Sequence, residues 1–192
     1  MGAADPKAKE TFNKEKQIVN KMIDIPKDAF VKYGVVQFDK MGETKIPLGE
    51  YPNEKELKER VKKLPLKEGK SLDEGIKKAG EEFEKNGRPK ARKILVVFMD
   101  GNDDSDKEKL KKVAEPLKKK NVKIIPVVLE ENVMEEKVKP LLPKKKKPKK
   151  GKDPSNLSEQ IAEDAFNGKR RYLLKIYNNN VEYLIIILRK LI

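Results

Sequence analysis

Apolar residues in this chain are gathered into short runs that are separated by longer polar stretches. Three of these runs are rich in β-branched residues and bounded by polar or turn residues, which predicts strands. They cover residues 33–38, 93–99 and 122–129. The last two are apolar on both faces, as is typical of parallel strands that helices cover on both sides.

Around these strands, apolar residues recur every three or four positions, which is the spacing of amphipathic helices. Two of the patterns carry a capping-box signal at their start, Ser71 with Glu74 and Ser105 with Glu108. The predicted helical patterns cover residues 12–23, 57–64, 72–83, 110–117 and 157–165.

Because strands and helices alternate, we expect an α/β fold with a doubly wound, mostly parallel sheet and helices on both faces. Ligands of such sheets bind beyond the carboxyl ends of the strands. Asp100 directly follows the strand at residues 93–99 and is therefore expected at that crevice. A structural role is the alternative, because Asp-Gly favours a turn and Asp103, Asp104 or Ser105 can cap the next helix.

Composition narrows the chemistry that such a crevice can perform. The 192 residues include no cysteine and no histidine, which excludes disulfides, thiolate or imidazole metal ligands, and Ser-His or Cys-His nucleophile pairs. No complete catalytic set can be assembled, so we expect a binding protein and not an enzyme. Charged residues make up 41% of the chain, which predicts a highly charged surface around one folded core.

The net charge of +14 lies mainly in the C-terminal part, because residues from Lys137 onward contribute 10 of these charges. Residues 137–152 are rich in lysine and proline, which predicts a solvated loop or linker. This run lacks arginine and aromatic residues, so nucleic acid is disfavoured as a partner. Anionic polysaccharide, an acidic matrix protein and a membrane surface stay open as alternatives. The candidate polyanion-binding residues are Lys144, Lys145, Lys146, Lys147, Lys149 and Lys150.

Residues 181–192 form the most hydrophobic stretch of the chain. They are shorter than the ~20 apolar residues that a membrane-spanning helix requires, so we expect no transmembrane segment. The first ten residues show no apolar segment of the kind found in export signals.

Three blocks, residues 33–38, 68–79 and 93–101, resemble in order and spacing a von Willebrand factor A-type (vWA) domain, over about residues 5–167. The resemblance implies a Rossmann-like three-layer sandwich with a metal-ion-dependent adhesion site at one edge of the sheet. In that family the site combines Asp-x-Ser-x-Ser after a central first strand, a Thr before a later helix, and the Asp of a strand-end Asp-Gly. Mg²⁺ takes octahedral oxygen coordination, which explains why three loops supply its ligands.

Carried over to this chain, the strand-end aspartate is Asp100, and the threonine position falls on Lys70 with Ser71 beside it. A protonated lysine is no metal ligand. The resemblance therefore implies a degenerate site, with Asp100 as a vestigial ligand, Ser71 as the other candidate ligand and only weak Mg²⁺ binding. Lys70, Asn102 and Asp103 are the candidate contacts to a partner.

The family's first strand and its metal motif are missing, because residues 4–12 align with the helix that follows them. Their loss would leave neighbouring strands with unpaired backbone groups. We therefore expect the vWA-like domain, residues 1–168, either to be N-terminally truncated or to have the gap filled by another segment. Residues 181–188 are the candidate strand for this gap. An extra helix or disorder are the alternatives for the tail, residues 169–192.

The resemblance implies a non-enzymatic protein-interaction or adhesion module of an extracellular or skeletal matrix, and it favours an extracellular location. An intracellular vWA scaffold is the second alternative. Polyanion or nucleic-acid binding through the lysine-rich segment is a third, from a different functional class.

Overall fold

The computed structural model describes residues 5–25, 31–66, 71–99, 105–129, 135–143, 146–166 and 182–188. Helices and strands alternate along most of this chain. The helices are α1 (Pro6–Asp24), α2 (Glu54–Lys62), α3 (Leu72–Asn86), α4 (Lys107–Lys119), α5 (Glu135–Val138) and α6 (Pro154–Ala165). The strands are β1 (Val31–Phe38), β2 (Gly42–Ile46), β3 (Arg92–Met99), β4 (Lys123–Val128), β5 (Lys149–Lys150) and β6 (Glu182–Leu188).

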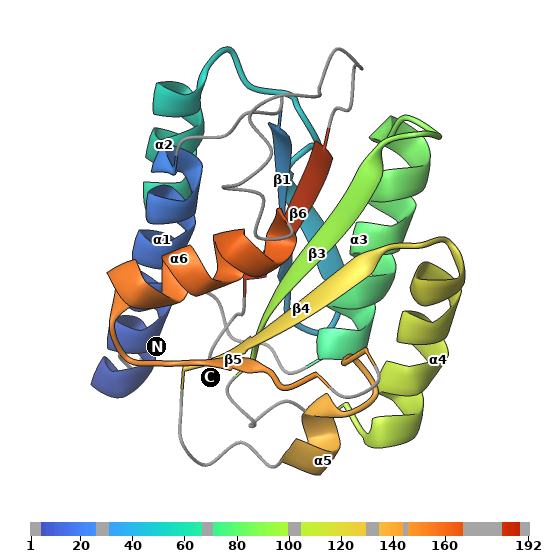
Figure 1. The fold of residues 1–192 in the computed structure, drawn as a ribbon. Helices are drawn as coiled ribbons and strands as arrows, with labels where there is room; N and C mark the ends of the chain where they lie inside the picture. The colour runs from blue at the N-terminus through green and yellow to red at the C-terminus, as the bar shows by residue number, and fades with distance from the viewer. Residues whose placement is uncertain are drawn as a thin grey trace.

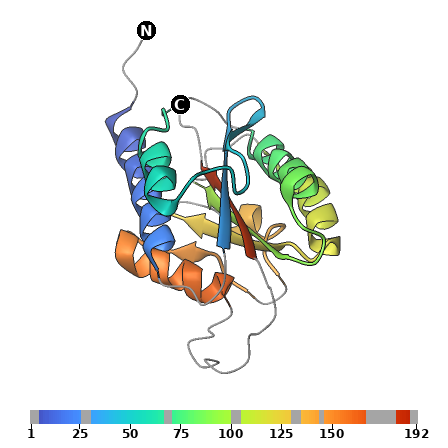
Figure 2. The ribbon, with the colours of Figure 1, turned by 90° about the horizontal axis from the view of Figure 1, so that it is seen from above.

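The strands form one sheet in the order β2-β1-β6-β3-β4-β5 (Figure 1). β1 and β2 pair antiparallel, whereas β1, β6, β3, β4 and β5 run parallel to one another. Helices α1, α2 and α6 cover one face, and α3 and α4 cover the other (Figure 2). The doubly wound, three-layer sandwich predicted from the sequence is therefore confirmed.

β6 lies at the centre of this sheet, between β1 and β3. Ile186 is in register with Val35 of β1 and with Val96 of β3, and its side chain is fully buried. The described part of the C-terminal tail therefore fills the position that the resemblance assigns to the family's central first strand. The alternative of an extra helix at this place is wrong.

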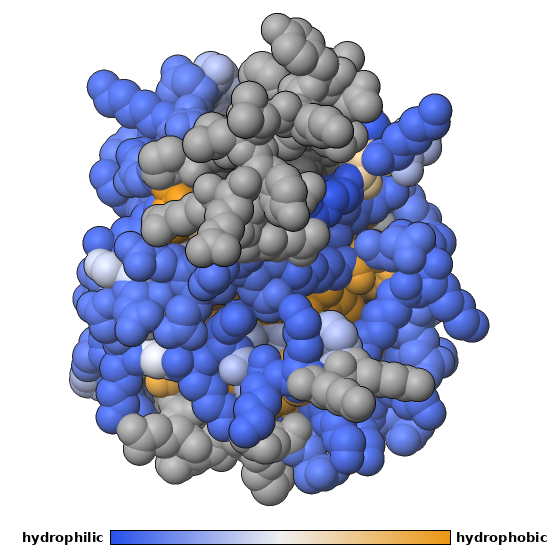
Figure 3. Space-filling view, viewed as in Figure 1, coloured by the Kyte–Doolittle hydropathy of each residue, from blue (hydrophilic) through white to orange (hydrophobic). Residues whose placement is uncertain are grey.

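Each face of the sheet has its own core, because successive side chains of a strand point to opposite faces. Val35 packs in the core under α1, α2 and α6, and the next residue, Val36, packs in the core under α3 and α4. On the face shown in Figure 3 the described surface is mostly hydrophilic, and hydrophobic residues show only as small patches between polar ones. No helix within the described residues has the length and apolar character needed to cross a membrane.

The predicted strands at residues 33–38, 93–99 and 122–129 agree with β1, β3 and β4 to within two residues at each end. β2 has no counterpart in the sequence pattern, because its residues are mostly polar. A tertiary contact holds β2 and the residues after it in place instead. Glu82 of α3 is buried and accepts hydrogen bonds from the Leu48 N–H at 2.8 Å and from the Thr44 hydroxyl at 3.3 Å.

Both predicted capping boxes are wrong. Ser71 occupies the N-cap position of α3, but its side chain makes no capping hydrogen bond. At α4 the N-cap is Asp106, whose carboxylate accepts a hydrogen bond of 2.8 Å from the Lys109 N–H. Ser105 is left for another contact, which is described below.

The lysine-rich segment, residues 137–152, is less solvated than the sequence predicts. Val138 and Leu141 are fully buried in the core under α3 and α4, and the end of the segment forms β5. Lys118 of α4 donates two hydrogen bonds to carbonyl groups of the turn that follows α5. Much of the segment is therefore an integral part of the domain.

We expect Ile186→Ala to lower the free energy of unfolding by about 2–5 kcal/mol, because it leaves a cavity at the centre of the sheet. Met41→Ala is the matched control, since Met41 is 70% exposed and its truncation should change stability by less than about 0.5 kcal/mol. Urea denaturation measures both. Equal midpoints for Ile186→Ala and the parent chain would contradict the central position of β6.

Candidate functional site

The carboxyl ends of the parallel strands meet along one side of the sheet, which we call the strand-end edge. β1 ends at Phe38, β3 at Met99 and β6 at Leu188. The pairing of Gln37 with Leu188 places the ends of β1 and β6 side by side. The β1–β2 turn and the first residues of α3 and α4 also lie at this edge.

The start of α3 is fixed to the end of β1. The Ser71 N–H donates a hydrogen bond of 2.9 Å to the Asp39 carbonyl, and the Asp39 carboxylate accepts one of 2.9 Å from the Met41 N–H. Gly75 lies so close to Phe38 that a Cβ at position 75 would be 3.0 Å from the ring. These contacts leave the β1–β2 turn little freedom relative to α3.

The starts of α3 and α4 are joined by a reciprocal pair of hydrogen bonds. The Ser105 hydroxyl donates to the Asp73 carboxylate at 2.6 Å and accepts from the Asp73 N–H at 3.1 Å. Ser105 is buried, so this pair is protected from water. Hydrogen bonds therefore join the β1–β2 turn and the starts of α3 and α4 into one platform at the strand-end edge.

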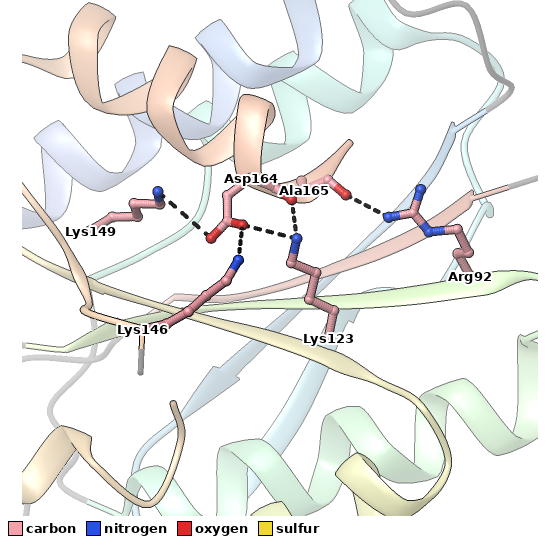
Figure 4. Close-up of polar contacts among 6 residues, drawn as sticks. All are labelled: Arg92, Lys123, Lys146, Lys149, Asp164 and Ala165. Atoms are coloured by element: carbon pink, nitrogen blue, oxygen red, sulfur yellow. Dashed lines mark hydrogen bonds and ion pairs between the residues drawn. The ribbon is translucent and has the colours of Figure 1, made fainter. Parts of the chain in front are cut away.

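A second polar cluster surrounds the C-terminal end of α6 (Figure 4). Lys123 and Lys146 both reach the same carboxylate oxygen of Asp164, at 2.9 and 2.8 Å, and Lys149 lies 3.7 Å from the other oxygen. Lys123 also donates to the backbone carbonyl of Asp164, and Arg92 donates at 3.0 Å to the carbonyl of the next residue. We call Arg92, Lys123, Lys146 and Lys149 the basic cluster.

The cluster has a favourable electrostatic setting, because cations are stabilised at the C-terminal end of a helix. Burial acts to raise the pKa of the Asp164 carboxyl, but the hydrogen-bonded lysines Lys146 and Lys123 outweigh it and hold that pKa below its ordinary value of 3.8. Asp164 therefore stays ionised at neutral pH. Its side chain is largely enclosed, with 15% of its surface exposed.

The fold and the strand-end edge can now be compared with known proteins. Residues 7–164 match the family model of the von Willebrand factor type A domain. The chain belongs to this family. The match covers α1 to α6 and excludes β6, so the central strand lies outside the part of the chain that the family model recognises.

Solved structures show the same fold at low sequence identity. Proximal thread matrix protein 1 from the mussel byssus is 21% identical, with a TM-score of 0.69 over 80% of this chain and 41% of the mussel chain. A von Willebrand factor type A protein from Catenulispora acidiphila is 19% identical, with a TM-score of 0.64 over 83% of this chain and 38% of that one. The manganese-loaded TRAP protein of Plasmodium vivax is 15% identical, with a TM-score of 0.53 over 88% and 59%. This chain therefore spans about two fifths of the mussel protein's length.

The described residues do not supply a complete vWA metal site. No group of three or more acidic, histidine or cysteine side chains within them could hold a metal ion. Of the oxygen donors at the strand-end edge, the carboxylate of Asp73 is bonded to Ser105 and that of Asp39 to the Met41 N–H. Ser71, which the sequence analysis selected, lies at the start of α3 beside this edge.

The other residues predicted for the two sites divide into three groups. Lys146 and Lys149 belong to the basic cluster, whereas Lys147 and Lys150 are exposed. Outside the described residues lie Lys70, Asp100, Asn102, Asp103, Lys144 and Lys145.

Sequence reasoning missed Asp164, Lys123 and Arg92. Arg92 and Lys123 are the first residues of β3 and β4, and Asp164 lies near the end of an ordinary amphipathic helix. Charged residues at the ends of strands and helices are common, so no local signal marks these three. Their convergence depends on strand register and on where α6 crosses the sheet.

Asp164→Asn is expected to lower the free energy of unfolding at pH 7 by about 1–2 kcal/mol, because it removes the counter-charge of a hydrogen-bonded lysine group. The pKa of Asp164 is lower in the folded state, so its contribution is complete well above pH 3.8 and is lost as the pH falls through the lowered value. The stability difference between the parent chain and the variant should therefore shrink towards zero in acid. Glu163→Gln, an exposed change on the same helix, is the control and should show no such difference. Chemical denaturation at several pH values measures this, and a pH-independent difference would contradict it.

Proposed function

We propose that this vWA domain is a non-enzymatic protein-interaction module of the matrix-adhesion type. Membership of the family supports an interaction role, and the likeness to a thread matrix protein of the mussel byssus supports the matrix type and an extracellular location. The chain spans only 41% of that mussel protein, so the proposal concerns this domain and not the activity of a larger protein.

The observation that carries the proposal is the rigid platform at the strand-end edge. A preformed surface loses little conformational entropy when a partner binds. Met41, next to the Asp39 loop, is the large hydrophobic side chain that stands exposed among the described residues, and methionine adapts well to a partner's surface. The proposed contact set is completed by Lys70, Asn102 and Asp103. In the sequence these residues lie close to the described residues at the starts of α3 and α4.

We propose further that this binding does not depend on a divalent cation. The mussel protein has been solved with zinc in its metal-ion-dependent adhesion site, and the Plasmodium vivax protein with manganese. In this chain the threonine position is Lys70, which carries a positive charge, and the proposed vestigial ligands are Asp100 and Ser71. A lone carboxylate and a hydroxyl offer Mg²⁺ little that its own water shell does not.

Titration calorimetry with Mg²⁺ and Mn²⁺ should therefore detect no binding at physiological concentrations, either for the parent chain or for Asp100→Ala. The reason is that too few oxygen ligands replace the water molecules that the ion would have to release. Tight binding that Asp100→Ala abolishes would contradict this proposal and would show that other residues complete the site.

An array of immobilised, purified extracellular matrix proteins tests the function itself. We expect the domain to bind at least one of them equally in EDTA and in Mg²⁺, and we expect Met41→Asp to weaken that binding about tenfold or more, because it places a charge in the centre of the contact. Lys147→Gln, an exposed change in the lysine-rich segment, should leave the binding unchanged. Binding to no matrix protein, or equal binding by Met41→Asp, would contradict the proposed role of the strand-end edge.

A further inference from the structure

The basic cluster is assembled from three neighbouring strands and the lysine-rich segment. Lys123 is in register with Ile94, which lies two residues after Arg92, and Lys149 is in register with Val127. Ile94 and Val127 both belong to the core under α6, and residues two apart on a strand share a face. Arg92, Lys123 and Lys149 therefore point to the same face of the sheet, where they surround the last turn of α6 (Figure 4).

Asp164 does not neutralise this cluster. Asp164 carries one negative charge. Lys146 and Lys149 bring two positive charges within ion-pair distance of it, and Lys123 brings a third. The exposed fractions place the carboxylate inside and the cations outside, since Asp164 is 15% exposed, Lys149 27% and Lys146 49%. An anion that approaches from solvent therefore meets ammonium groups first.

Asp164 also fixes where these ammonium groups lie. A free lysine side chain has many rotamers, and holding it in place for a ligand costs conformational entropy. The Asp164 carboxylate holds Lys146 at 2.8 Å and Lys149 at 3.7 Å. These two ammonium groups are thus positioned before an anion binds, which lowers the entropy cost of binding it.

The surroundings of the cluster favour one class of polyanion. Stable protein partners need buried aromatic or aliphatic anchors, and the exposed large hydrophobic residue of the described chain is Met41, at the strand-end edge. Single-stranded nucleic acid is bound by stacking on aromatic rings, and none lies in the segment from Lys146 to Lys152. An acidic polysaccharide requires neither feature, because its sulfate or carboxylate groups are bound by charge.

We propose that the basic cluster is a second binding site, for the sulfate or carboxylate groups of an acidic polysaccharide, in which Asp164 holds the lysines in position. Lys146 and Lys149 contact the polysaccharide directly, while Lys123 and Arg92 tie α6 to the sheet and add to the positive field. This site shares no residue with the strand-end edge, so it stands or falls independently of the proposed protein-interaction function.

The test compares two double variants that remove the same charge from the same segment, Lys146→Gln/Lys149→Gln and Lys147→Gln/Lys150→Gln. Binding to immobilised heparin and to hyaluronan, which carries carboxylates but no sulfate, is measured at several salt concentrations. The first variant should bind about tenfold more weakly, with a shallower salt dependence, and the second should change by less than about threefold. Lys146→Arg/Lys149→Arg should restore binding, which separates loss of charge from loss of folding. Equal losses in the two Gln variants would overturn the site, because charge alone would then explain retention.

Asp164→Asn and Glu163→Gln give a second comparison, in which each removes one negative charge from α6. If Asp164 holds the lysines for the ligand, Asp164→Asn should weaken heparin binding by at least about threefold, and Glu163→Gln should change it much less; tighter binding by Asp164→Asn would overturn the positioning role. Equal effects of the two variants would overturn the role of Asp164. Poly-glutamate and duplex DNA are the competitors, and tighter binding of either than of heparin would overturn the assignment to polysaccharide.

Discussion

The pairing of β6 with both β1 and β3 is the constraint on which the rest of the domain depends. Buried backbone N–H and C=O groups need partners, and leaving one unpaired costs about 1–3 kcal/mol. Without β6, β1 and β3 would present facing rows of unpaired groups in the middle of the sheet. Ile186 also joins the core under α1, α2 and α6, so the same strand supplies hydrogen bonds and apolar packing.

The central strand β6 lies outside the part of the chain that the family model matches. The match ends at residue 164, and β6 follows at residues 182–188. The Arg92 side chain binds the carbonyl of Ala165 at the end of α6, and its backbone is in register with Glu182 at the start of β6. The end of the last helix and the start of the central strand thus lie near one residue.

The charged residues of this basic chain serve two different purposes. At the strand-end edge, Asp73 is committed to Ser105, and the result is a fixed platform. At the end of α6, several cations share Asp164, and the result is a concentration of positive charge that the fold tolerates because part of it offsets the helix dipole. Both arrangements organise side chains before a partner arrives. They lie on different parts of the molecule and share no residue.

The amino-acid sequence by itself determined the α/β class, the positions of β1, β3 and β4, and the family. Those features depend on local periodicity and on the order of apolar runs, and both can be read from the sequence. Only the tertiary structure decided that residues 182–188 form the central strand, because an apolar run of that length suits a strand or a helix until its neighbours are known. It also decided that Ser105 binds Asp73 and does not cap α4, since a hydroxyl takes whichever partner the fold places nearest. Of the basic cluster, only Lys146 and Lys149 could be predicted from the sequence, as part of its lysine-rich segment. Arg92, Lys123 and Asp164 are separated by long stretches of chain, and their meeting depends on strand register and on the path of α6, which no local pattern records.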